Sequence, residues 1–115
     1  MKKIAYLLDL LCILIFVAIG RHAHNHGESL KGIASTTWPF AVGLAVGWIK
    51  IVATHRDILA KKSGGIVVLS TVIIGMILRV VAGQGTAFAF CIVALTFLSL
   101  FIIGWRAIAA KFLSK

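Results

Sequence analysis

The hydrophobic pattern divides the chain into four long apolar runs separated by short polar segments. The last run, residues 86–105, holds twenty consecutive residues without a charge. At about 1.5 Å of rise per residue, a helix of this length spans a hydrocarbon core of roughly 30 Å. The pattern therefore predicts an all-α, four-helix transmembrane bundle that forms a single integral membrane domain over residues 1–115. Its helices are expected at residues 4–20, 37–54, 66–82 and 86–105.

Local signals set the expected helix ends. The segment of residues 21–37 is polar, contains glycine and has no apolar periodicity, so we expect a loop there. Thr37 can cap the second helix, and Pro39 supplies a pre-set φ near its first turn without losing an intrahelical hydrogen bond. Residues 55–63 are expected to form a short basic connection to the third helix.

Small residues recur at four-residue spacing within the second and third helices. Gly43 and Gly47 form a G-x-x-x-G pair, and Thr71 and Gly75 repeat the pattern. In lipid such pairs let two helix backbones approach closely, so we expect Gly43, Gly47 and Gly75 to be helix-packing residues.

Composition and charge support a membrane protein. The chain is 61% hydrophobic and only 13% charged, and its net charge of +9 lies at the ends of the apolar runs. A nucleic-acid-binding protein gathers its charge on a soluble face, so we expect the lipid bilayer, and no nucleic acid, as a partner. Nine of the twelve Lys and Arg residues fall on the side of the two termini, which predicts that both termini are cytoplasmic. The three on the other side are Arg21, Lys31 and Arg79.

Asp9 is the one acidic residue inside an apolar run. It lies about 9 Å inside the inner boundary, where an unpaired carboxylate is costly, so it must face protein or water. Lys50 and Arg106 reach a similar depth, and either could pair with it. Arg79 is a poorer partner because its axial offset from Asp9 is on the order of 12 Å. Both a structural ion pair and a proton-relay or ion-pathway role remain open.

Basic residues on the other side are further candidates for binding. Arg21 and Arg79 could hold an anion or a lipid phosphate together with helix N-termini, or could simply complement the helix C-terminal dipoles. His22, His24 and His26 offer at least two metal ligands, but solvated surface histidines are the commoner outcome of such a tract. We expect no metal site and no cofactor.

Several motifs occur in a fixed order along nearly the whole chain, and together they resemble a family of small four-span bacterial membrane proteins classed as a domain of unknown function. The motifs are Gly20-Arg21-x-x-His24, Trp38-Pro39-Phe40, Gly75-x-x-x-Arg79 and Gly104-Trp105-Arg106. The resemblance implies an integral protein of the bacterial inner membrane with no assigned activity. It also favours Asp9, Arg21, His24 and Arg79 over His22 and His26 as residues to test for binding.

Three function classes follow. The first is a transport-like or ion-conducting module in which Asp9 titrates. Four helices are too few to enclose a pathway. Such a module would therefore need a homo-oligomer, formed through faces such as that of Gly43 and Gly47. The second is a non-catalytic assembly or regulatory subunit of a larger membrane protein. The third is an enzyme acting on a lipid phosphate, with His24 as base and Arg21 and Arg79 as phosphate ligands. The sequence shows no nucleophile or paired carboxylates, so an enzyme is the least favoured, and the transport-like module is favoured over the subunit.

Overall fold

The computed structural model describes residues 2–23, 30–83 and 88–113, with side chains at 3–20, 34–83 and 91–112. The residues that flank the π-helical segment η1 keep right-handed helical dihedral angles, so α4, η1 and α5 form one continuous rod. Within the described residues, four helical rods are long and apolar enough to cross a membrane. The expected all-α, four-span fold is therefore confirmed. Its elements are α1 (Lys2–Ala23), α2 (Leu30–Ala53), α3 (Lys61–Val81), α4 (Phe88–Leu98), η1 (Ser99–Ile103) and α5 (Gly104–Leu113).

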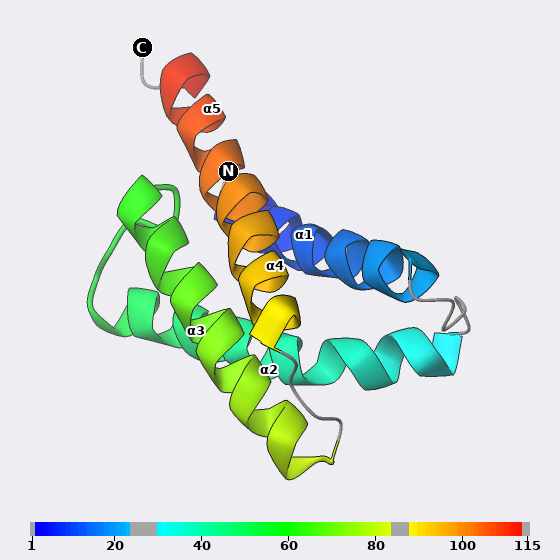
Figure 1. Ribbon diagram of the computed structural model, residues 1–115. Coiled ribbons are helices and arrows are strands. Elements are labelled where there is room, and N and C mark those ends of the chain that lie inside the picture. Colours follow the sequence, from blue (N-terminus) through cyan, green and yellow to red (C-terminus); the bar gives the residue numbers. More distant parts are fainter. Residues whose placement is uncertain (1, 24–29, 84–87, 114–115) are drawn as a thin grey trace.

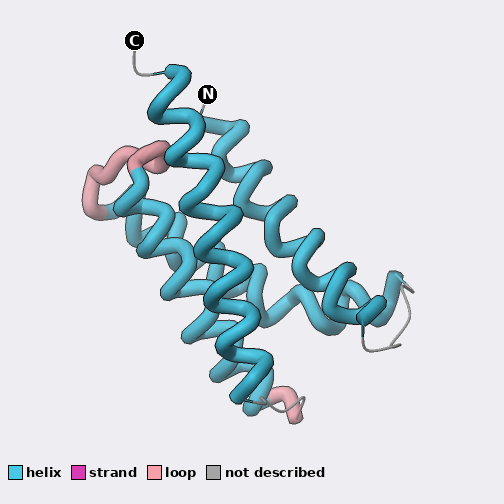
Figure 2. Tube along the Cα trace, turned by 45° about the horizontal axis from the view of Figure 1, so that its top comes forward, coloured by secondary structure: helices cyan, strands magenta, loops and turns pink. Residues whose placement is uncertain are grey.

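The four rods pack as a ring. Both α1 and α3 contact α2 and the fourth rod, and the most extensive packing is between α2 and α3. Figures 1 and 2 show that the start of α1, the α2–α3 connection and α5 lie at the same end of the molecule, which we call the terminal end. Toward the other end, the pair of α1 and α2 diverges from the pair of α3 and α4.

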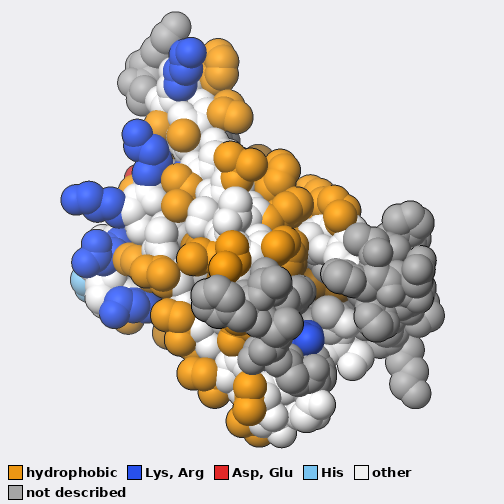
Figure 3. Space-filling model, viewed as in Figure 1, with side chains coloured by type: hydrophobic (Ala, Val, Ile, Leu, Met, Phe, Trp, Pro, Cys, Tyr) orange, Lys and Arg blue, Asp and Glu red, His pale blue; other side chains and the backbone are white. Residues whose placement is uncertain are grey.

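Apolar side chains fill the centre of the ring and also cover its outside. Phe16 of α1 contacts Phe40 of α2 and Phe97 of α4, with ring centroids 6.1 and 5.3 Å apart. Leu98 and Ile102 are fully buried beside them. Each rod also exposes large apolar side chains, which Figure 3 shows spread over the surface. This distribution fits a protein that is surrounded by hydrocarbon, because exposing an apolar side chain to lipid tails carries no free-energy penalty.

All four rods extend beyond their predicted bounds. α1 does so at both ends, from Lys2 to Ala23, and the loop expected at residues 21–37 is helical at 21–23 and 30–37. α2 begins at Leu30, so Thr37 lies inside the helix and the prediction that it caps the second helix is wrong; Pro39 likewise lies inside α2. α3 begins at Lys61, and the fourth rod continues to Leu113. Hydropathy marks only the apolar part of a span, whereas intrahelical hydrogen bonding favours continuing the helix through the polar residues at the membrane boundary.

The small residues of α2 and α3 bring these two helices into backbone contact. A Cβ atom added at Gly43 would lie 2.7 Å from the carbonyl oxygen of Ser70, and one added at Gly47 would lie 3.1 Å from the Ser70 Cβ. The Ser70 hydroxyl donates a hydrogen bond of 2.6 Å to the Gly43 carbonyl. Gly75 packs in the same way against the ring of Phe40.

This packing changes the expected role of the glycine face. α3 of the same chain covers Gly43 and Gly47, which are both buried. A homo-oligomer formed through these two glycines, as the transport-like hypothesis required, would have to displace α3, so that part of the hypothesis is wrong.

Candidate functional site

The main polar feature of the described interior is a buried ion pair between α1 and α5. Asp9 and Arg106 are both fully buried, each with 0% relative exposure. Nη1 of Arg106 donates to Oδ1 of Asp9 at 2.7 Å, and Nη2 donates to Oδ2 at 2.8 Å. This two-point geometry matches the planar guanidinium to the planar carboxylate and makes the bonds strong and directional. Of the two partners expected for Asp9, the structure selects Arg106, whereas Lys50 is exposed.

Two indole groups complete the surroundings of Asp9. Nε1 of Trp105 donates to Oδ1 at 3.0 Å, and Nε1 of Trp48 donates to Oδ2 at 3.1 Å. Each carboxylate oxygen therefore accepts two hydrogen bonds, which fills the roughly four lone-pair sites that a carboxylate offers. The ring of Tyr6 packs edge-on against Trp48 at 5.0 Å. We call Asp9, Trp48, Trp105 and Arg106 the ion-pair cluster.

Two further hydrogen bonds of Arg106 go to backbone carbonyl groups. Nε donates to the carbonyl of Ile58 in the α2–α3 connection at 2.8 Å, and Nη1 also donates to the carbonyl of Ile102 at 3.2 Å. The guanidinium carbon lies 4.3 Å from the ring centroid of Trp105. Arg106 thus joins α1 and α5 to the connection before α3, and its charge is matched by Asp9 and by these oxygen atoms.

The α2–α3 connection is shaped to present the Ile58 carbonyl. His55 has a φ of 57°, which turns the chain after the end of α2. Oδ1 of Asp57 accepts a hydrogen bond from the Leu59 amide, and the Asp57 carbonyl accepts one from the Ser63 hydroxyl. These bonds hold the connection against the first turn of α3.

Gly64 makes space for Arg106 at the start of α3. A Cβ atom added there would lie 3.0 Å from Cδ of Arg106 and 3.2 Å from Cγ1 of Ile103. A larger residue would push α3 away from the fourth rod. The glycine therefore lets the arginine side chain pass between the two rods.

The π-helical segment η1 keeps Arg106 on the inner face of the fourth rod. The buried residues of this rod recur every four positions, at Ala94, Leu98, Ile102 and Arg106. In an α-helix four residues turn about 40° beyond a full circle, so such a stripe drifts around the helix. The wider turns of η1, with hydrogen bonds to the fifth residue, reduce this drift just before Arg106.

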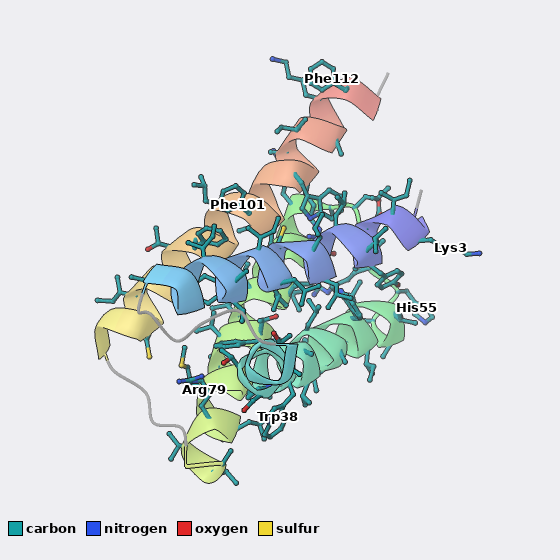
Figure 4. The ribbon with its side chains drawn as sticks, turned by 90° about the vertical axis from the view of Figure 1, so that its right-hand side faces the viewer. Lys3, Trp38, His55, Arg79, Phe101 and Phe112 are labelled. Carbon is teal, nitrogen blue, oxygen red and sulfur yellow. The ribbon has the colours of Figure 1, made fainter. Side chains whose placement is uncertain are left out.

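The other candidate residues do not join this cluster. Arg79 lies near the end of α3, about 22 Å along the helix from Gly64, and Figure 4 places it far from Lys3 and His55 of the terminal end. Arg21 lies in the last turn of α1, but its side chain is outside the described residues. His24 and His26 also lie outside them, as does the His22 side chain. The anion-binding and metal-binding hypotheses for these residues stay predictions.

Sequence reasoning missed both indole donors and the Ile58 carbonyl. Trp48 and Trp105 fit equally well as interfacial anchors, which is the usual role of tryptophan near a membrane boundary. Their depth along the helices could have indicated this role, because both lie at the level of Asp9 and carry an N–H that can donate to a buried carboxylate. Ile58 offered no side-chain signal, because only its backbone takes part.

Residues 6–109 match the family described as "Protein of unknown function (DUF3054)". The chain belongs to the DUF3054 family. This confirms the resemblance to a family of small four-span membrane proteins. No curated protein and no solved structure matches the chain. In this DUF3054 protein the whole ion-pair cluster and the Ile58 carbonyl lie inside the matched range.

Proposed function

We propose that this multi-pass membrane protein is a non-catalytic assembly or regulatory subunit of a larger membrane protein. The observation that carries the proposal is the ion-pair cluster. Arg106 ties α1 and α5 to the α2–α3 connection, Trp48 adds α2 through its bond to Asp9, and both oxygen atoms of Asp9 are fully used. A buried polar network in which the partners are satisfied favours one arrangement of the helices over others. A fixed shape suits a subunit that presents a surface to a partner.

The packed centre of the ring supports the same proposal. Phe16 contacts both Phe40 and Phe97 inside the ring, and Ile13 is fully buried on the same helix as Phe16. A conducting pathway through a single copy would have to cross these rings. A transporter also has to rearrange its helices, which here would break the buried hydrogen bonds of Arg106.

We further propose that the terminal end faces the cytoplasm of a bacterial cell. Its exposed cations outnumber its one exposed acidic side chain, Asp57, and such an excess is typical of the cytoplasmic side. Figure 3 shows these basic side chains along one edge of the molecule. Among the described side chains, the exposed cations at this end are Lys3, Lys50, Arg56, Lys61, Lys62 and Lys111.

Co-purification from native membranes tests the subunit proposal. The tagged full-length chain, extracted in mild detergent, should carry a second integral membrane protein in a fixed ratio, and deleting the chain should lower the amount of that protein in the membrane. Cross-links should map to outward-facing side chains such as Ile49 and Leu69. Recovery of the chain alone, together with an unchanged membrane proteome in the deletion strain, would contradict the proposal.

A transport-like module is the second candidate, and one observation favours it. Among the described side chains, the hydroxyl groups of Thr37 and Thr71 are buried without a hydrogen-bond partner, and polar groups of this kind can line an ion path. Purified protein in liposomes with a pH-sensitive dye tests this candidate. Proton flux above that of empty liposomes, lost in Thr71→Val and retained in Thr96→Val on the exposed face of α4, would replace the subunit proposal.

A further inference from the structure

An apolar groove separates the first turns of α1 from α5 at the terminal end. It has a volume of about 260 Å³. Ile4 and Leu8 of α1 form one wall, Ile108 and Ala109 of α5 form the other, and Trp105 closes the end next to the ion-pair cluster.

The groove exists because the two helices part after the cluster. α1 and α5 are held together by Asp9 and Arg106, but beyond that point their described backbones make no close contact. Figures 1 and 4 show α5 leaning away from the start of α1. Two of the lining residues, Ala5 on α1 and Ala109 on α5, are alanines, whose small side chains leave space between the helices.

We propose that this groove holds an acyl chain of an anionic phospholipid from the surrounding leaflet. The groove lies between the depth of Asp9 and the boundary at Lys3, within the region that lipid chains occupy. Its walls offer water almost no hydrogen-bonding group, so a hydrocarbon chain fits there and ordered water does not.

The charge around the groove selects an anionic headgroup. Lys111 follows Ala109 on α5, and Lys61 and Lys62 follow Leu59, which also lines the groove; all three lysines are exposed. Asp57 is the one exposed acidic side chain described at this end, and one of its oxygens accepts a hydrogen bond from the Leu59 amide. Basic residues at a membrane surface attract anionic lipids in preference to zwitterionic ones.

An occupied groove would also protect the ion-pair cluster. The N–H at one edge of the Trp105 ring donates a hydrogen bond to Asp9, and Trp105 also lines the groove. A bound chain would keep headgroup water away from this edge, so lipid binding and the stability of the fold should rise together.

Thermal unfolding of the full-length protein in detergent tests this. Phosphatidylglycerol should raise the Tm by about 4 °C more than phosphatidylcholine with the same acyl chains. Ala109→Phe fills the groove and should lose the response to phosphatidylglycerol, whereas Ala110→Phe, an exposed position on the same helix that does not line the groove, should keep it. Neutralising Lys61, Lys62 and Lys111 to Gln should remove the preference between the two lipids.

A second variant covers the case in which Ala109→Phe does not fold. Ile108→Ser removes apolar contact without filling the groove, and native mass spectrometry should then find fewer phosphatidylglycerol molecules retained than on the wild type. Equal stabilisation by both lipids, or an equal Tm shift with inorganic phosphate alone, would overturn the proposal. The proposal would also be overturned if Ala109→Phe kept the full lipid response. It would likewise be overturned if Ala109→Phe lost a cross-linked protein partner and not the lipid response.

Discussion

At the scale of single residues, the buried carboxylate governs the energetics of the terminal end. Asp9 is costly to bury, and its cost is offset by four hydrogen bonds and the charge of Arg106. Removing one partner leaves the other charge buried and unmatched, which is far more unfavourable than removing both. The two residues should therefore behave as one unit in mutagenesis.

We expect Asp9→Asn to lower the free energy of unfolding by about 3–5 kcal/mol, because Arg106 keeps its charge without a counter-ion. The measurement is unfolding in mixed detergent micelles followed by circular dichroism. In the double variant Asp9→Asn, Arg106→Gln, the loss should be smaller than the sum of the single losses by about 0.5–3 kcal/mol. Additive losses would show that the pair is not coupled. Arg79→Gln, combined with Asp9→Asn, serves as the distant control and should be additive.

The indole donors can be tested without changing charge. Trp105→Phe keeps an aromatic ring but removes the N–H that donates to Asp9 at 3.0 Å. A hydrogen bond to a charged group contributes about 1.5–3 kcal/mol, so we expect a loss of that size in the same unfolding assay, and a similar one for Trp48→Phe. Trp38→Phe is the matched control, because Trp38 is 42% exposed and on the same helix as Trp48. Equal losses for all three variants would rule out a special role for the two donors.

At the scale of elements, close backbone packing joins α2 to α3, and the α2–α3 connection joins them to the cluster. Both contacts depend on residues without a side chain: Gly43 faces the Ser70 carbonyl between α2 and α3, and Gly64 faces Arg106 between α3 and α5. In lipid the hydrophobic effect does not drive helices together, because apolar side chains gain little by leaving the lipid. Close van der Waals packing at small residues drives helix association there.

Gly43→Ala should therefore destabilise the protein by about 1–3 kcal/mol, because the new Cβ would lie 2.7 Å from a backbone oxygen that cannot move aside. Gly65→Ala, on α3, meets no atom within 4 Å and should be neutral or gain up to about 1 kcal/mol of helix propensity. Thermal stability in detergent distinguishes the two. A Gly43→Ala variant as stable as Gly65→Ala would contradict the packing described here.

At the scale of the whole molecule, four rods place the α2–α3 connection and α5 at one end and the last turn of α3 at the other. The proposed orientation puts the terminal end, with the α2–α3 connection and α5, in the cytoplasm. It rests on the exposed cations of that end and on the positive-inside rule.

Cysteine labelling checks this orientation. In a background without Cys12 and Cys91, we expect Ala82→Cys to react with a membrane-impermeant maleimide in intact cells and Arg56→Cys to react only after the membrane is opened. Both positions are exposed and lie at opposite ends of α3. A reversed pattern would overturn the orientation alone, whereas labelling of both in intact cells would overturn the crossing of α3.

The sequence by itself determined the number of spans and the class of protein. Long apolar runs can be satisfied in lipid only as helices, so periodicity and length were enough for the fold. It also limited the partners of Asp9 to Lys50 or Arg106, because depth along a helix follows from residue number.

Only the tertiary structure decided which partner Asp9 takes and what surrounds it. Rotation about each rod depends on packing, and η1 sets that rotation just before Arg106. The Trp48 and Trp105 donors, the Ile58 carbonyl and the space at Gly64 come from four separate segments, and no local pattern brings them together. The helix ends were also decided there, because backbone hydrogen bonding extends a helix past the point where its apolar residues stop.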